Sequence, residues 1–167
     1  MSWKYRRCCG IDVHRDQVTV CVLPPDGQKG DVVVKVYRTF TENLRQLRFW
    51  LQALKVTEVA MESTGVYWRP VWNVLEGHFR LLLVNPAQVK ALLGRKSDRR
   101  DARRIAEFLR DQRLDASFVP PPEIRYLREL MRDRVSLVEE RTRVGNQIRA
   151  LLETANIKLG SVASDVL

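Results

Sequence analysis

Residues 7–23 read RCCGIDVHRDQVTVCVL, and the hydrophobic pattern of this stretch decides the fold. The short apolar run at 7–13 predicts one strand, and the alternation of valines with smaller or polar residues over 17–23 predicts a second. Prolines, an aspartate and a glycine follow at 24–27 and mark a turn, after which a β-branched run at 32–37 predicts a third strand. Three consecutive strands joined by short turns indicate an antiparallel meander.

Helices and further strands follow this meander in alternation. Thr41 is predicted to be the N-cap of a helix over 41–54, in which leucines recur at helical spacing. The other expected elements, in chain order, are a strand at 58–61, a helix at 66–75, a strand at 80–84 and a short helix opened by Pro86. Three strands followed by α-β-α-β-α indicate an α/β fold: a mixed sheet flanked by helices, with right-handed crossovers between its later strands.

The last third of the chain predicts two more helices. Ser97 is expected to cap the first, and three prolines at 120–122 separate it from a proline-free stretch at 123–155. In that stretch, seven of the nine positions that alternate spacings of three and four residues are apolar, which is typical of a coiled coil or an extended helical hairpin. A long helix packed on its own domain fits the pattern equally. We therefore expect a first domain at 1–117 and a helical arm at 118–167.

Composition limits the class of protein. The 167 residues include 29 Lys and Arg against 20 Asp and Glu, a formal net charge of +9, and 45% are hydrophobic. This composition excludes intrinsic disorder and collagen, and no apolar run reaches the roughly 18 residues that a membrane span needs. The three cysteines, Cys8, Cys9 and Cys21, lack metal-binding spacing and are expected to be small buried hydrophobic residues of a reduced, cytoplasmic protein.

Carboxylates at the ends of predicted strands are the informative residues. Asp12 ends the first strand, and Glu62 follows the strand at 58–61, so both could point to a covered side of the sheet. Asp98 and Asp101 lie three residues apart in the first turn of a predicted helix, at the edge of its core-facing stripe. A buried carboxylate is costly unless it is paired or bound to metal.

Four carboxylates that meet at one point would form an oxygen-rich site suited to Mg²⁺ or Mn²⁺. Two such ions about 4 Å apart activate a nucleophile and stabilise the leaving oxygen of a phosphodiester. Each acid also has an ordinary explanation, because Asp98 and Asp101 suit the positive end of a helix dipole and Asp12 suits a turn beside Arg15. Taken together, and with arginines around Asp98, the acids favour the metal site.

Basic and aromatic residues surround the proposed site in the sequence. Residues 95–113 carry eight basic and four acidic groups, a concentration that favours a polyanion as partner, although many basic helices are only solvated faces. The candidates for phosphate contact are Arg95, Lys96, Arg99, Arg100, Arg103 and Arg104. Tyr67 and Trp68 are candidates for stacking on bases, whereas Trp72 is expected in the core.

Three motifs carry a family resemblance. They are GIDVH at 10–14, MESTGVYW at 61–68, and GRKSD at 94–98 followed by RDA at 100–102. With these motifs the sequence resembles, from about Arg7 to its end, the DEDD-type insertion-sequence transposases. Those proteins are bridge-RNA-guided serine recombinases with a RuvC-like amino-terminal domain. The second and third motifs are specific, and the first alone would be weak.

The resemblance implies a ribonuclease-H-like fold in which four residues are the catalytic, metal-binding acids: Asp12, Glu62, Asp98 and Asp101. It also implies action on DNA phosphodiesters in transposition, a structured guide RNA as partner, and homo-oligomers assembled partly through the helical arm. In the family a carboxy-terminal domain supplies a nucleophilic serine, so a chain that stops at Leu167 is expected to be a fragment, and Ser63 is not assigned that role. The alternatives are a junction-resolving metal-dependent endonuclease and a non-catalytic module that binds nucleic acid and dimerises.

Overall fold

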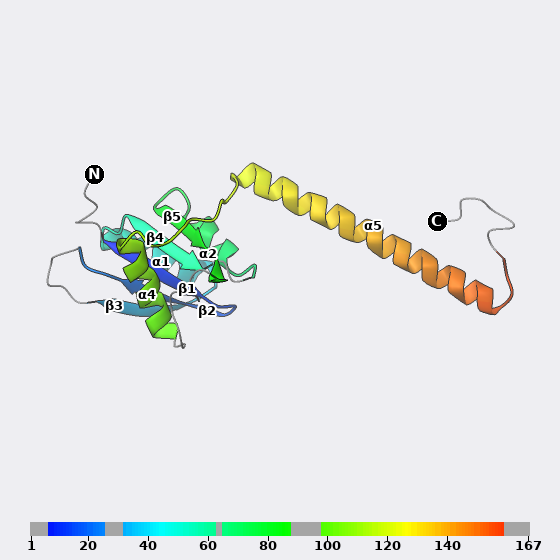
Figure 1. Cartoon of the computed structure of the whole chain (residues 1–167), viewed down its shortest axis with the longest axis horizontal. Coiled ribbons are helices and arrows are strands. Elements are labelled where there is room, and N and C mark those ends of the chain that lie inside the picture. Colours follow the sequence, from blue (N-terminus) through cyan, green and yellow to red (C-terminus); the bar gives the residue numbers. More distant parts are fainter. Residues whose placement is uncertain (1–6, 26–31, 63–64, 88–97, 159–167) are drawn as a thin grey trace. The chain divides into compact units, whose positions relative to one another are not determined.

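The computed structural model describes residues 7–25, 32–62, 65–87 and 98–158, with residues 98–100 given by their backbone alone. The chain divides into two compact units, Met1–Phe118 and Val119–Leu167. The first unit is an α/β domain, and the second contains one long helix (Figure 1).

The first unit is built on one five-stranded sheet. Its strands are β1 (Cys8–Val13), β2 (Gln17–Val22), β3 (Val33–Arg38), β4 (Glu58–Glu62) and β5 (Arg80–Val84). They lie in the order β3-β2-β1-β4-β5. The pairs β1–β2 and β2–β3 are antiparallel, whereas β1–β4 and β4–β5 are parallel. The meander and the mixed sheet predicted from the sequence are confirmed.

Three helices in the described part of this unit flank the sheet. They are α1 (Thr41–Ala53), α2 (Trp68–Leu75) and α4 (Asp98–Arg110). Helix α2 begins later than predicted, because a turn at 65–67 with Gly65 at φ +53° precedes it. Pro86 and Ala87 are helical, but the rest of the short helix predicted there and the Ser97 cap lie outside the described residues.

The predicted cap of α1 is wrong by one residue. The N-cap is Phe40, with an extended backbone and no side-chain cap, and Thr41 is the first helical residue. The amide of Leu44 donates to the carbonyl oxygen of Phe40 at 3.0 Å. Phe40 therefore supplies the first helical acceptor and is the N-cap, and Thr41 already lies inside the helix. The leucine spacing is confirmed, because Leu44, Leu47 and Leu51 are buried.

Helix α4 packs directly on the sheet at Gly10. A Cβ atom at this position would lie 2.2 Å from the carbonyl oxygen of Ala102 and 2.4 Å from the amide nitrogen of Ala106. Only a residue without a side chain allows a helix backbone to come so near a strand. The core-facing stripe predicted for this helix is confirmed, because four of its residues are buried: Ala102, Ile105, Ala106 and Leu109.

The cysteines are buried free thiols, as predicted. Burial raises the pKa of Cys21 to about 11 and holds the pKa of Cys9 well above its ordinary value. Both thiols therefore stay protonated at neutral pH and pack as small apolar groups.

The second unit contains α5 (Pro122–Thr154), the helix predicted at 123–155. Pro122 suits the first turn, where the amide hydrogen that it lacks would have no helical partner. Apolar side chains along the helix are exposed, among them Leu127, Leu137 and Leu151. Whether they form a coiled coil or a hairpin stays a prediction. None of the helices in the described ranges combines the length and apolar character needed to cross a membrane.

Gly10→Ala is expected to lower the free energy of unfolding by about 3 kcal/mol, the upper end of what overpacking costs. The added methyl group would meet backbone atoms of α4, which move only if the whole helix shifts. Urea unfolding followed by circular dichroism measures the change. Gly77→Ala is the control, because Gly77 has open space around it but a φ of +79°, and this change should cost about 1–2 kcal/mol. A Gly10→Ala protein at least as stable as the control would contradict the close packing of α4.

Candidate active site

Two carboxylates lie at the carboxyl ends of neighbouring parallel strands, because Asp12 is the penultimate residue of β1 and Glu62 is the last residue of β4. The register of β1 and β4 pairs Ile11 with Met61, so one step further along Asp12 lies beside Glu62. Because alternate residues share a face, both acids belong to the face of the sheet on which Gly10 meets α4. Asp12 is only 7% exposed, and Glu62 is half-buried. The topology therefore places these two predicted site residues next to each other.

A histidine at the rim of the sheet contacts Asp12. The Nε2 atom of His14 lies 3.1 Å from Oδ2 of Asp12. When the Asp12 carboxylate is ionised, as a metal ligand must be, it only accepts hydrogen bonds, and the imidazole then donates from Nε2. His14 belongs to the first motif, at 10–14, but no role was predicted for it. The available signal was its place two residues after Asp12, on the same face of the strand.

Helix α4 brings a third carboxylate toward the same edge. Leu109 belongs to one core cluster with Cys8, at the start of β1, whereas Ala102 lies over Gly10 further along that strand. The helix therefore runs opposite to β1, and its first turn lies toward the carboxyl end of the strand. Asp101 in this turn has a buried Oδ1 oxygen without a hydrogen-bond partner in the described structure.

The fourth predicted acid, Asp98, is the first residue of α4, and its side chain lies outside the described structure. Among the side chains that are described, no three from His, Cys, Asp and Glu lie close enough together to hold a metal ion. The convergence of all four acids therefore stays a prediction. The donors that are present fit Mg²⁺ or Mn²⁺, because they are carboxylate oxygens, and one of them, Oδ1 of Asp101, is buried without a hydrogen-bond partner.

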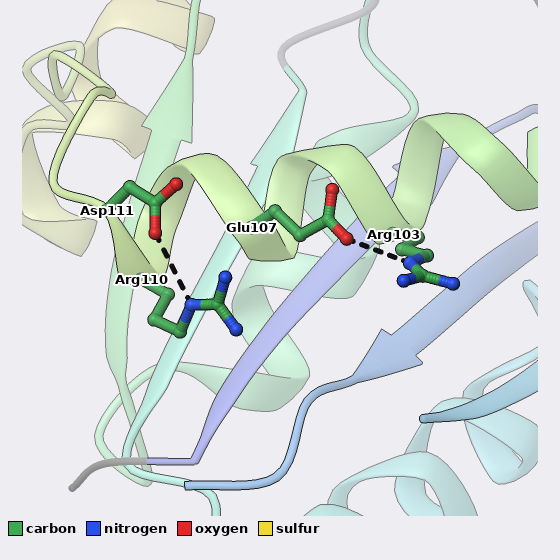
Figure 2. A network of polar contacts seen from close by, with 4 residues as sticks. All are labelled: Arg103, Glu107, Arg110 and Asp111. Carbon is green, nitrogen blue, oxygen red and sulfur yellow. Dashed lines mark hydrogen bonds and ion pairs between the residues drawn. The ribbon is translucent and has the colours of Figure 1, made fainter. Parts of the chain in front are cut away.

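Basic residues of α4 form ion pairs with acidic residues on the helix or just after it (Figure 2). Arg103 donates from Nε to Oε1 of Glu107 at 2.8 Å, and Arg110 donates from Nε to Oδ1 of Asp111 at 3.3 Å. The hydrogen bond to Glu107 raises the pKa of Arg103, so its guanidinium is always charged. Arg104 is half-buried. The other predicted phosphate contacts lie outside the described side chains: Arg95, Lys96, Arg99 and Arg100.

The two aromatic candidates differ in their surroundings. Tyr67, in the turn before α2, is 40% exposed. Trp68 is half-buried and meets Trp72 edge to face, with ring centroids 5.8 Å apart. Trp72 is buried, as predicted. Tyr67 therefore offers the more accessible ring for stacking on a base, whereas Trp68 is partly occupied by packing.

A protein-family model matches most of the chain. The model of the DEDD transposases of the IS110 type, described as transposase, matches residues 9–157. No curated protein sequence matches the chain.

Solved structures give the fold. RuvC of T. thermophilus in complex with a Holliday junction substrate is similar, with a TM-score of 0.51 and 16% sequence identity over 68% of this chain and 100% of that chain. A second structure of Thermus thermophilus RuvC has a TM-score of 0.47 and 17% identity, and covers 66% of this chain and 99% of that one. Fowlpox virus resolvase with Holliday junction DNA has a TM-score of 0.45 and 8% identity, and covers 63% of this chain and 99% of that one. The first likeness confirms the predicted ribonuclease-H-like fold.

Asp101→Ala is expected to raise the free energy of unfolding of the metal-free protein by about 0.5–1 kcal/mol. The change removes a buried oxygen without a partner, which costs about 1–3 kcal/mol, and this gain exceeds the lost attraction to the helix dipole of about 0.3–1 kcal/mol. Urea unfolding in the presence of a chelator measures the difference. Glu107→Ala is the control on the same helix, and it should lose a few tenths of a kcal/mol with its bond to Arg103. A less stable Asp101→Ala protein would mean that this oxygen is satisfied.

Proposed function

The chain belongs to the DEDD transposase family of the IS110 type, and we propose that it acts on DNA phosphodiesters in transposition with the help of a divalent metal. The observation that carries this proposal is the buried Asp12 beside Glu62, with the unpartnered Oδ1 of Asp101 on the helix turn nearest to them. Such an arrangement reduces the stability of the fold. It is typical of a place where function requires the charges.

Mg²⁺ or Mn²⁺ is the proposed cofactor, held through the carboxylates of Asp12, Glu62, Asp98 and Asp101. When bound, the metal would stabilise the negative charge that develops on the phosphate oxygens. The protein positions the carboxylates. Two of them lie at strand ends fixed by the sheet, and two lie in the first turn of α4. The close contact at Gly10 sets how near that turn comes to the strands.

DNA is the proposed substrate, and a structured guide RNA is the proposed second partner. The similar RuvC structure holds a Holliday junction, and the first unit of this chain has the same fold. A net charge of +9 favours a polyanion, and the charged Arg103 is exposed on the helix that carries Asp101. Contacts to phosphates by this side of α4 would position the backbone of the nucleic acid at the carboxylates.

Self-association through α5 is the third part of the proposal. Exposed apolar side chains recur along this helix with spacings that favour helix pairing: Leu127, Leu130, Leu137, Val144, Ile148 and Leu151. A second copy of the helix would bury them, and a homo-oligomer would bring two catalytic domains to one DNA substrate.

Adding Mg²⁺ or Mn²⁺ is expected to raise the melting temperature of the wild-type chain. A cation that binds the folded state stabilises it by about 2.7 kcal/mol at a hundredfold excess over Kd. Asp98→Asn combined with Asp101→Asn should abolish the shift in a fluorimetric titration. The control, Asp111→Asn with Asp133→Asn, removes the same charge from exposed positions and should keep the metal-induced shift in melting temperature. If the first double variant keeps the full shift, these acids do not share a metal site.

Arg103→Gln with Arg104→Gln is expected to weaken binding to DNA of any sequence. The slope of log affinity against log salt should flatten by about 1–2, because fewer counterions are released. Fluorescence anisotropy with a labelled duplex measures this slope. Arg132→Gln with Arg134→Gln on α5 has the same loss of charge and should leave the slope unchanged. An unaltered slope in the α4 variant would assign its arginines to a solvated face.

A further inference from the structure

The hydrogen bond between His14 and Asp12 points to a role for the histidine. We propose that His14 is a positioning residue, whose imidazole fixes the Asp12 carboxylate in the orientation in which that carboxylate meets a divalent cation. This inference rests on the proposed function, because it concerns the same metal site. It adds a residue outside the four acids to the machinery of that site.

The contact joins an exposed group to a buried one. Nε2 of His14 is 3.1 Å from Oδ2 of Asp12, and the two side chains are 46% and 10% exposed. A carboxylate with so little access to water takes its orientation from protein donors. The neighbouring pair of Arg15 and Asp16, at 3.8 Å, has both partners exposed, and a pair of that kind contributes little. The bond to Asp12 is therefore the stronger constraint of the two.

The turn that carries His14 is itself held in place. The amide of His14 donates to the carbonyl oxygen of Gln17 at 3.0 Å and closes the turn between β1 and β2. Thr39, just after β3, donates from its amide to the carbonyl of Asp16 at 3.2 Å and from its hydroxyl to the carbonyl of Arg15 at 2.8 Å. The backbone of the turn is thus tied to a third strand. Because the backbone of His14 is held in place, little conformational entropy is lost when its imidazole hydrogen-bonds to the carboxylate.

An imidazole suits this task better than a longer cationic side chain. Arginine next to Asp12 would donate two hydrogen bonds but would add a permanent positive charge where a cation has to bind. An imidazole can donate one hydrogen bond without carrying such a charge. Metal ligands whose hydrogen-bonded neighbour is removed lose about 10–100-fold in metal affinity. Because His14 is half exposed, we expect about 10-fold, the lower end of that range.

The test measures metal binding by the full chain, without nucleic acid. Mg²⁺ and Mn²⁺ are titrated separately while the melting temperature is recorded. His14→Ala should raise the half-saturating metal concentration about 10-fold. His14→Gln keeps an N–H donor at similar reach and should restore most of the affinity. His78→Ala is the matched control, because this second exposed histidine contacts Arg48, at 3.2 Å, and should behave as wild type.

A spectroscopic measurement reports the contact directly. The chain has two histidines, so the ring signals of His14 are assigned by comparison with His78→Ala. These signals should shift when Mg²⁺ is added to the wild-type chain and should not shift in Asp12→Asn.

Each outcome separates the inference from the proposal beneath it. A wild-type chain without any metal-induced stabilisation would overturn the proposed function and the role of His14 with it. A wild-type chain that responds, with an unchanged midpoint in His14→Ala, would overturn the positioning role alone. Loss of affinity that His14→Gln does not restore, together with a lower melting temperature in chelator, would make His14 a structural residue of the turn.

Discussion

The contact of the α4 backbone with Gly10 is the constraint on which the rest of the domain depends. It sets the distance between the sheet and the helix at the middle of β1, the central strand. Ala102 and Ala106 are small for the same reason, since larger side chains on this line would hold the helix away. The position of Asp101 relative to Asp12 follows from this distance. Gly10 therefore determines both how α4 packs on the sheet and where Asp101 lies relative to Asp12.

Much of the fold could be predicted because its signals are local and repeated. Valines alternating over β2 and leucines at helical spacing in α1 each report which face is buried. Single-residue boundaries could not be predicted in this way. The start of α1 depends on which carbonyl accepts the first helical hydrogen bond, and Phe40 does so although Thr41 has the better side chain for a cap. The late start of α2 depends on the turn at Gly65.

The candidate site was predictable where topology alone decides it. Asp12 and Glu62 lie at the carboxyl ends of parallel neighbouring strands, and a period of two residues is enough to place them on one face. The bond from His14 to Asp12 was not predictable, because it depends on the side-chain conformation at the end of a strand. The ion pair between Arg103 and Glu107 could have been expected, because the two residues are four apart on one helix, whereas Arg103 was predicted only as a phosphate contact.

The length of helix α5 sets the distance between its two ends. Its 33 residues span about 50 Å at 1.5 Å per residue. That distance equals about fifteen base pairs of DNA at 3.4 Å each. With its proline confined to the first turn, the helix is uninterrupted, and its two ends are separated by a distance equal to about one and a half turns of duplex. An insertion of about seven residues would lengthen the helix and keep its apolar side chains aligned along one face. An insertion of about five would rotate the apolar face at one end away from the apolar face at the other.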